Sequence, residues 1–209
     1  MNKFQELKDV LYLDSDPIGV KLAYDFVKPS KESPKFKEIS NLGGYCEYVK
    51  RASQGEYLKI QKGDFSCHTG NVTLGFLESD NLELTMKLDS KGLKYIYLFP
   101  INKYIMEDYD SIILILNPHN CMNLIHAYVN LYKKPLKITC GAINGVCIEV
   151  TAHVIKRNEI NFSFLCPSSR KNRIFSECEL LCGIPARMTN DLIDAIKNYL
   201  YSEMNQQID

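Results

Sequence analysis

The sequence has no excess of either charge, because its 209 residues include 25 Lys plus Arg and 25 Asp plus Glu. A chain without net charge has no overall field that would attract nucleic acid or an anionic membrane surface. Its most apolar run, residues 111–116, is also far too short to span a bilayer. We therefore expect no nucleic-acid partner and no membrane insertion.

The first residues lack the features of a secretory signal peptide, because MNKFQELKDVLYLD is charged and amphipathic. We expect a cytoplasmic protein, in which thiols stay reduced and disulfides are rare. Internal repeats and low-complexity segments are missing as well. The length and the 45% content of hydrophobic residues suit one compact domain, residues 1–209.

Close-spaced metal motifs are also missing, since none of the eight cysteines belongs to a CxxC pair. The most common zinc and iron–sulfur signatures are therefore excluded. Cys178 and Cys182 are the nearest pair, at a spacing that would place both on one side of a helix, and their apolar context favours core packing. Cys121 and Cys140 also fall within apolar segments.

Hydrophobic periodicity predicts a mixture of strands and helices. Strand-like segments cover residues 18–24, 57–61, 92–100, 111–117, 136–143 and 158–166. Helical patterns cover the first residues and the segments 44–55, 118–132 and 191–205, the last with a candidate cap at Thr189 or Asn190. We expect an α+β or mixed α/β domain with a mixed β-sheet and flanking helices.

Four cysteines share a position at the end of a predicted element, next to a turn. They are Cys46, Cys67, Cys147 and Cys166. A glycine-containing turn precedes the first three, and Pro167 follows the fourth. Backbone N–H groups at such ends can point at a ligand, and a helix N-terminus lowers the pKa of a thiol. For each cysteine alone, the alternative is a small buried residue that packs like an apolar group.

These cysteines lie in motifs that resemble domain-of-unknown-function family 169, a family of archaea and anaerobic bacteria. The motifs are DPIGVKLAY, YCEYVKRASQGEYLKI, DFSCHTGNVTLGF, LNPHNCMNLIHAYV, GVCIEV, and CPSSR followed by GIPARM. The resemblance covers nearly the whole chain. It implies a four-cysteine set, matched here by Cys46, Cys67, Cys147 and Cys166, and it implies no particular reaction. The family usually has a glycine before the arginine, whereas this chain has Pro167-Ser168-Ser169 before Arg170.

Four thiolates from distant segments suit a [4Fe–4S] cluster or a structural zinc ion. Structural zinc usually takes close-spaced ligands, because short turns lower the entropy cost of loop closure. Ligands spread from position 46 to position 166 need the folded domain first. We therefore favour the cluster, with zinc as the alternative. The distribution of the family among anaerobes also fits an oxygen-sensitive cluster.

Three further residues are candidates for binding a ligand. His68 follows Cys67 and is predicted to donate a hydrogen bond to the cluster; the alternative is a solvent-facing side chain. Asn117 follows a buried strand and begins a helix, where α/β sheets place ligands; the alternative is helix capping. Arg170 is predicted to offset negative charge on the cluster; the alternative is a solvated surface position.

The residues leave three functions open. The first is a cluster protein of anaerobic metabolism, in electron transfer or in maturation of a cofactor or another enzyme, with a protein redox or maturation partner. The second is an enzyme that binds a small molecule at a cysteine-lined cluster or metal site. The third is a metal-free enzyme with one nucleophilic thiol, for which sequence proximity of Cys67 and His68 is no evidence of spatial proximity. Self-association as a homodimer is left open.

Overall fold

The computed structural model of the chain describes residues 2–24, 33–78, 86–89 and 92–206, with no side chains described from residue 203 onward. Its strands are β1 (Ile18–Ala23), β2 (Lys37–Glu38), β3 (Leu58–Gln61), β4 (Tyr95–Pro100), β5 (Ser111–Leu116), β6 (Asn161–Ser163) and β7 (Leu180–Pro185). They form one sheet in the order β2-β3-β4-β1-β5-β7-β6. Each neighbouring pair is antiparallel except β2 and β3, which are parallel.

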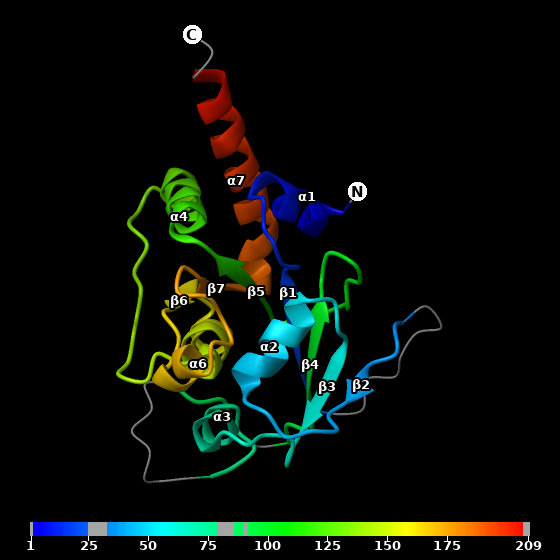
Figure 1. The fold of residues 1–209 in the computed structure, drawn as a ribbon. Coiled ribbons are helices and arrows are strands. Elements are labelled where there is room, and N and C mark those ends of the chain that lie inside the picture. Colours follow the sequence, from blue (N-terminus) through cyan, green and yellow to red (C-terminus); the bar gives the residue numbers. More distant parts are fainter. Residues whose placement is uncertain (1, 25–32, 79–85, 90–91, 207–209) are drawn as a thin grey trace.

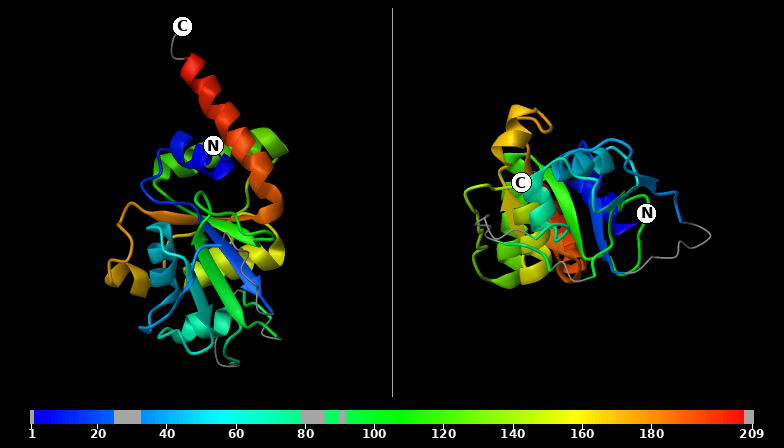
Figure 2. Two further views of the ribbon diagram at one scale, coloured as in Figure 1. Left: turned by 90° about the vertical axis from the view of Figure 1, so that its right-hand side faces the viewer. Right: turned by 90° about the horizontal axis from the view of Figure 1, so that it is seen from below.

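Helices cover both faces of this sheet. They are α1 (Lys3–Val10), α2 (Tyr45–Ser53), α3 (His68–Thr73), α4 (Pro118–Tyr132), the π-helix η1 (Ile148–Ala152), α5 (His153–Arg157), α6 (Pro167–Lys171) and α7 (Ala186–Gln206). α1 and α4 both pack on α7. These three helices gather at the top of Figure 1, whereas α2, α3 and α6 lie in its lower half; Figure 2 shows the arrangement from two other sides.

Two hydrophobic cores result, one on each face, because successive residues of a strand point to opposite faces of a sheet. β5 shows this clearly: Ile113 and Ile115 belong to the core that contains α2 and η1, whereas Ile112, Leu114 and Leu116 belong to the core with α4 and α7. Every residue of β5 is buried. The continuous apolar run that predicted a strand covered on both faces is thus confirmed.

The predicted fold class is confirmed: a mixed sheet with flanking helices, of the α+β type. The strands predicted at 18–24, 57–61, 92–100 and 111–117 correspond to β1, β3, β4 and β5. The helices predicted at 44–55 and 118–132 correspond to α2 and α4. The expectation of a single domain over residues 1–209 stays a prediction.

The strand predicted at 136–143 is wrong. This segment has no regular secondary structure and runs beside the edge strand β6. The Asn161 side chain holds it, accepting from the Thr139 N–H at 2.9 Å and donating to the Thr139 carbonyl at 2.8 Å. One side-chain amide therefore replaces the backbone ladder that the apolar alternation predicted. Cys140, expected within an apolar element, is exposed.

Two expectations near the C-terminal end are also corrected. Cys182 lies in β7, paired with Leu114 of β5, and is fully buried, whereas Cys178 lies in an exposed turn. Helical spacing therefore does not relate the two, and core packing is confirmed for Cys182 alone. The last helix begins at Ala186, directly after β7, and the Thr189 hydroxyl donates to the Pro185 carbonyl inside its first turn instead of forming an N-cap.

No helix in the described part of the chain has both the length and the apolar character that crossing a membrane requires.

Candidate functional site

The four cysteines that the sequence singled out each stand at the beginning of a helix. Cys46 is the second residue of α2, and Cys147 is the second residue of the helical run that continues into η1. Cys67 and Cys166 are the N-cap residues of α3 and α6. Two local patterns thus recur, GxC in the first pair and a cysteine followed three residues later by glycine or serine in the second.

In the GxC pattern, a glycine carbonyl begins the helix and leaves room for the cysteine sulfur. The Gly44 carbonyl accepts from the Glu47 N–H at 2.9 Å, and the Gly145 carbonyl accepts from the Glu149 N–H at 2.8 Å. A Cβ atom at Gly44 would lie only 3.1 Å from Cys46 Sγ, and one at Gly145 only 3.4 Å from Cys147 Sγ. Glycine therefore allows each sulfur to lie close against the chain that begins its helix.

In the second pattern, the sulfur itself caps the helix. Cys67 Sγ accepts a hydrogen bond from the Gly70 N–H at 3.4 Å. Cys166 Sγ accepts from the Ser169 N–H at the same distance and lies 3.2 Å from the Ser169 hydroxyl. Sulfur replaces the oxygen that Ser, Thr, Asp or Asn would supply at an N-cap.

The four cysteines come from four separate elements, and their charges influence the pKa of Cys147 and of Cys46. Burial raises the pKa of the Cys147 thiol, and the charges of Cys67, Cys166 and Cys46 raise it further. Burial also raises the pKa of Cys46, and Cys166 adds to that increase. Such effects need short separations, so the fold brings the four predicted cysteines into one neighbourhood.

Hydrogen-bond donors surround these sulfurs. The Ser169 hydroxyl lies 3.2 Å from Cys166 Sγ and lowers the pKa of Cys46. The Glu47 N–H also lowers the pKa of Cys46. The Thr73 hydroxyl acts on Cys147 and lowers its pKa. Ser169 and Thr73 are both fully buried. Cys67 and Cys166 each accept a hydrogen bond from a backbone N–H, whereas the Thr73 hydroxyl completes no hydrogen bond within the described residues.

The surroundings of the site are otherwise apolar. Cys147 belongs to the core on the α2 side of the sheet, and Cys46 packs against that core. The members of this core within two residues of one of the four cysteines are Tyr45, Tyr48, Phe65, Val146, Ile148 and Leu165. An apolar shell restricts solvent access and lowers the local dielectric around a bound group.

Within the residues that the structure describes, no group of three or more His, Cys, Asp or Glu side chains has the arrangement of a single-ion metal site.

His68 and Arg170 are positioned differently from each other. His68 is the first residue of α3 and has an exposed side chain, so its contact with a cluster stays a prediction. Arg170 donates to three backbone carbonyls, those of Phe164, Ser176 and Glu179, at 2.6–3.2 Å. Its guanidinium therefore fastens the loop that follows α6, and its role toward a ligand also stays a prediction.

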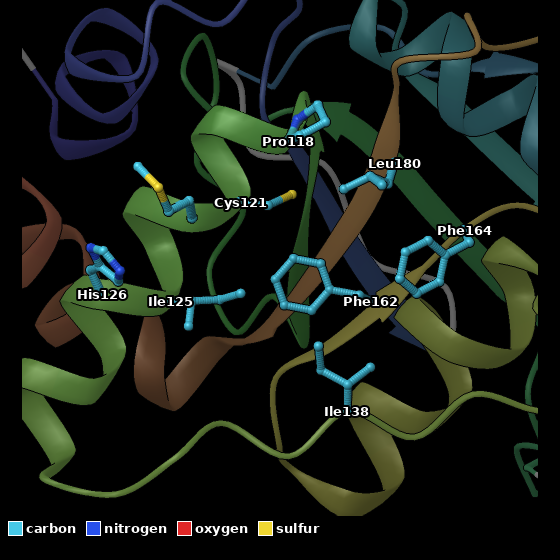
Figure 3. Close-up of a pocket in the computed structure, with 9 residues that line it drawn as sticks. Pro118, Cys121, Ile125, His126, Ile138, Phe162, Phe164 and Leu180 are labelled. Atoms are coloured by element: carbon cyan, nitrogen blue, oxygen red, sulfur yellow. The ribbon is translucent and has the colours of Figure 1, made fainter.

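Asn117 caps α4, with its side-chain oxygen accepting from the Asn120 N–H at 2.8 Å. A groove of about 370 Å³ lies beside the start of this helix. Its lining is almost entirely apolar and consists of Pro118, Cys121, Met122, Ile125, His126, Ile138, Phe162, Phe164 and Leu180 (Figure 3). Asn117 is not part of that lining, and ligand binding by Asn117 stays a prediction.

Sequence reasoning missed the two buried hydroxyl groups of the site. Ser169 carries a partial signal, because it follows Cys166 by three residues, as Gly70 follows Cys67. Thr73 carries none, since it meets Cys147 only where α3 packs against η1. A contact between segments so far apart in sequence depends on the fold.

Comparison with known proteins supports the resemblance seen in the motifs. No curated protein and no solved structure matches the chain. The model of domain-of-unknown-function family 169, described as uncharacterised ArCR, matches residues 6–90 and 81–195. These two matches span β1 to β7, all four cysteines and the first part of α7. The chain therefore belongs to domain-of-unknown-function family 169.

Proposed function

We propose that this protein binds an iron–sulfur cluster of the [4Fe–4S] type through Cys46, Cys67, Cys147 and Cys166. One observation carries the proposal: the other three cysteines all act electrostatically on the buried Cys147, and two of them accept a backbone N–H, in an apolar part of the fold. Four cysteine thiolates are the usual ligands of such a cluster, and hydrogen bonds to sulfur are among the features that adjust its potential.

The donors favour sulfurs that bear negative charge. A thiolate only accepts hydrogen bonds, whereas a neutral thiol is a weak donor and a weak acceptor. Burial and the neighbouring sulfurs raise the pKa of Cys147 and Cys46, so these groups would be neutral if nothing were bound. A coordinating metal removes the thiol proton. The site therefore suits bound metal better than a free nucleophilic thiol, which must be a thiolate to react.

The wide separation of the ligands along the chain favours a cluster over zinc. Structural zinc usually takes close-spaced ligands, because short turns lower the entropy cost of loop closure. The four cysteines come instead from four separate helix starts, those of α2, α3, η1 and α6. Zinc remains the alternative cofactor.

Electron transfer, or maturation of a cofactor or another enzyme, is the role that we favour for such a cluster. A carrier of electrons needs a protein partner and no substrate cavity. The apolar groove beside α4 is lined by none of the four cysteines, so it gives no support to a substrate bound at the cluster. An enzyme that binds a small molecule at the cysteine site is the alternative, and a cavity beside the four sulfurs would favour it.

Anaerobic purification tests the proposal. The wild-type protein, reconstituted with ferrous iron and sulfide if necessary, should show a broad absorbance near 400 nm and about four irons and four sulfides per chain. Serine replacements of Cys46, Cys67, Cys147 and Cys166, made one at a time, should each remove most of that absorbance.

Cys140→Ser and Cys178→Ser are matched controls, because both cysteines are exposed and neither belongs to the set. Both variants should keep the wild-type iron and sulfide content. A colourless wild type that binds one zinc would replace the cluster by zinc, and a wild type that takes up neither metal would refute the proposal.

A further inference from the structure

Two buried hydroxyl groups lie beside the cysteine sulfurs. The Ser169 side chain is fully buried, with its oxygen 3.2 Å from Cys166 Sγ, and it also lowers the pKa of the Cys46 thiol. Ser169 thus lies near a sulfur at the start of α2 as well as the one at the start of α6. Loss of this hydroxyl would affect two of the four sulfurs at once.

Thr73 is the second such group. It is fully buried, and its hydroxyl has no completed hydrogen bond within the described residues. Thr73 belongs to α3, which packs against η1 directly after Cys147, and its hydroxyl lowers the pKa of the Cys147 thiol. A buried hydroxyl without a partner costs about 1–3 kcal/mol. The cost would be removed if the neighbouring sulfur became a charged acceptor.

We infer that the hydroxyl groups of Ser169 and Thr73 are hydrogen-bond donors to the thiolates of a bound cluster and raise its reduction potential. The inference rests on the proposed function. It assigns to the two residues a positioning and tuning role, since neither is itself a metal ligand.

The physical reason is the extra negative charge of the reduced state. In a titration, the cluster takes up one electron from the external reductant, and no bond forms or breaks. A donor directed at a sulfur stabilises the more negative state more than the less negative one, and the low dielectric of the apolar shell strengthens the effect. Removal of a donor should therefore make the protein harder to reduce.

The test uses the cluster-loaded protein in a mediated redox titration with dithionite. Ser169→Ala and Thr73→Val should each move the midpoint potential to more negative values. A tenfold loss of relative stability of the reduced state corresponds to about 59 mV for one electron. Ser168→Ala is the matched control: Ser168 is the preceding serine of the same helix, its side chain is exposed, and its hydroxyl only meets Asn172.

A second measurement separates tuning from a structural role for Thr73. In the metal-free protein, Thr73→Val replaces an unsatisfied hydroxyl by a methyl group of similar shape, so the free energy of unfolding should stay unchanged or increase. The same variant should nevertheless lower the potential of the loaded protein. A purely structural threonine would change the stability without moving the potential.

The two proposals fail in different ways. A wild-type protein without a cluster would refute the proposed function itself. A loaded wild type whose potential equals that of Ser169→Ala and Thr73→Val within error would refute only the tuning role. An equal shift in Ser168→Ala would also overturn the inference, because it would trace the change to the helix and not to the buried hydroxyl.

Discussion

Gly183 in β7 lies so close to Val150 of the π-helix that a Cβ atom at position 183 would be 2.4 Å from the Val150 carbonyl oxygen. The same Cβ would be 2.6 Å from a methyl group of Val154. Only glycine permits this approach, since real Cβ atoms do not come so near to backbone oxygen. The contact seats η1 on the sheet and thereby fixes the depth of Cys147 at the start of that helix.

Gly183→Ala should therefore destabilise the fold by about 1–3 kcal/mol, the usual cost of overpacking a core. It should also lower the cluster content, because the helix that carries Cys147 must shift. Chemical denaturation and iron analysis measure the two effects. Gly70→Ala is a suitable control for stability alone, since a Cβ there would meet its neighbours at ordinary distances of 3.7–3.9 Å, although Gly70 also donates to Cys67 Sγ. Equal stability of Gly183→Ala and wild type would contradict this account of the contact.

Arg170→Ala should lower the free energy of unfolding by about 1–3 kcal/mol, because three carbonyls would lose a charged donor. The loop after α6 would loosen, and cluster retention at Cys166 should fall with it. Lys171→Ala, at an exposed position of the same helix, should have no such effect. Wild-type stability in Arg170→Ala would show that its guanidinium is free for another role, such as the predicted contact with a ligand.

Asp16 should make stability depend on pH. Burial raises its pKa, but hydrogen bonds from Lys103, Lys8 and Asn102 outweigh that effect, and the net pKa is lowered. A carboxyl with a lowered pKa contributes stability above its unfolded value of about 3.9, and this contribution is lost as the pH falls through the folded value.

Asp16→Asn should thus cost about 1–3 kcal/mol at pH 7, since it leaves the two ammonium groups without their carboxylate. The difference from wild type should shrink as the pH falls below about 4. Denaturation curves at several pH values measure this. Asp14→Asn, at an exposed position two residues away, should show no comparable loss. A constant difference at every pH would exclude the proposed linkage.

The thiols of the metal-free protein should react with iodoacetamide in an order set by burial. Burial raises the pKa of Cys121 to about 12 and raises that of Cys147 and Cys182 as well. Because the thiolate is the reacting species, these three should be alkylated at least about tenfold more slowly than the exposed Cys140 and Cys178 at pH 8. Mass spectrometry of the peptides gives the rates. Early labelling of Cys147 would reveal an open site.

Local sequence pattern was sufficient for much of the fold. The apolar run of β5, the alternation of β4 and the helical spacing of α4 depend on which faces of each element are buried, and that pattern is written in the residues themselves. It failed at 136–143, where an alternating segment lies beside β6 without a backbone ladder. Alternation indicates an extended chain with two different faces. It does not specify what satisfies the backbone, which here is the Asn161 side chain.

The four cysteines could likewise be selected by their turns and by the family motifs, since a residue at the start of a helix is a local feature. Their convergence could not be read in the same way. It depends on α2 and η1 packing on the sheet and on α3 packing against η1, with close contacts such as that of Gly183 with Val150. The sequence by itself determined the elements and the candidate sulfurs. Only the tertiary structure decided that Thr73 lies beside Cys147, because contacts between distant segments depend on long-range packing and leave no local pattern.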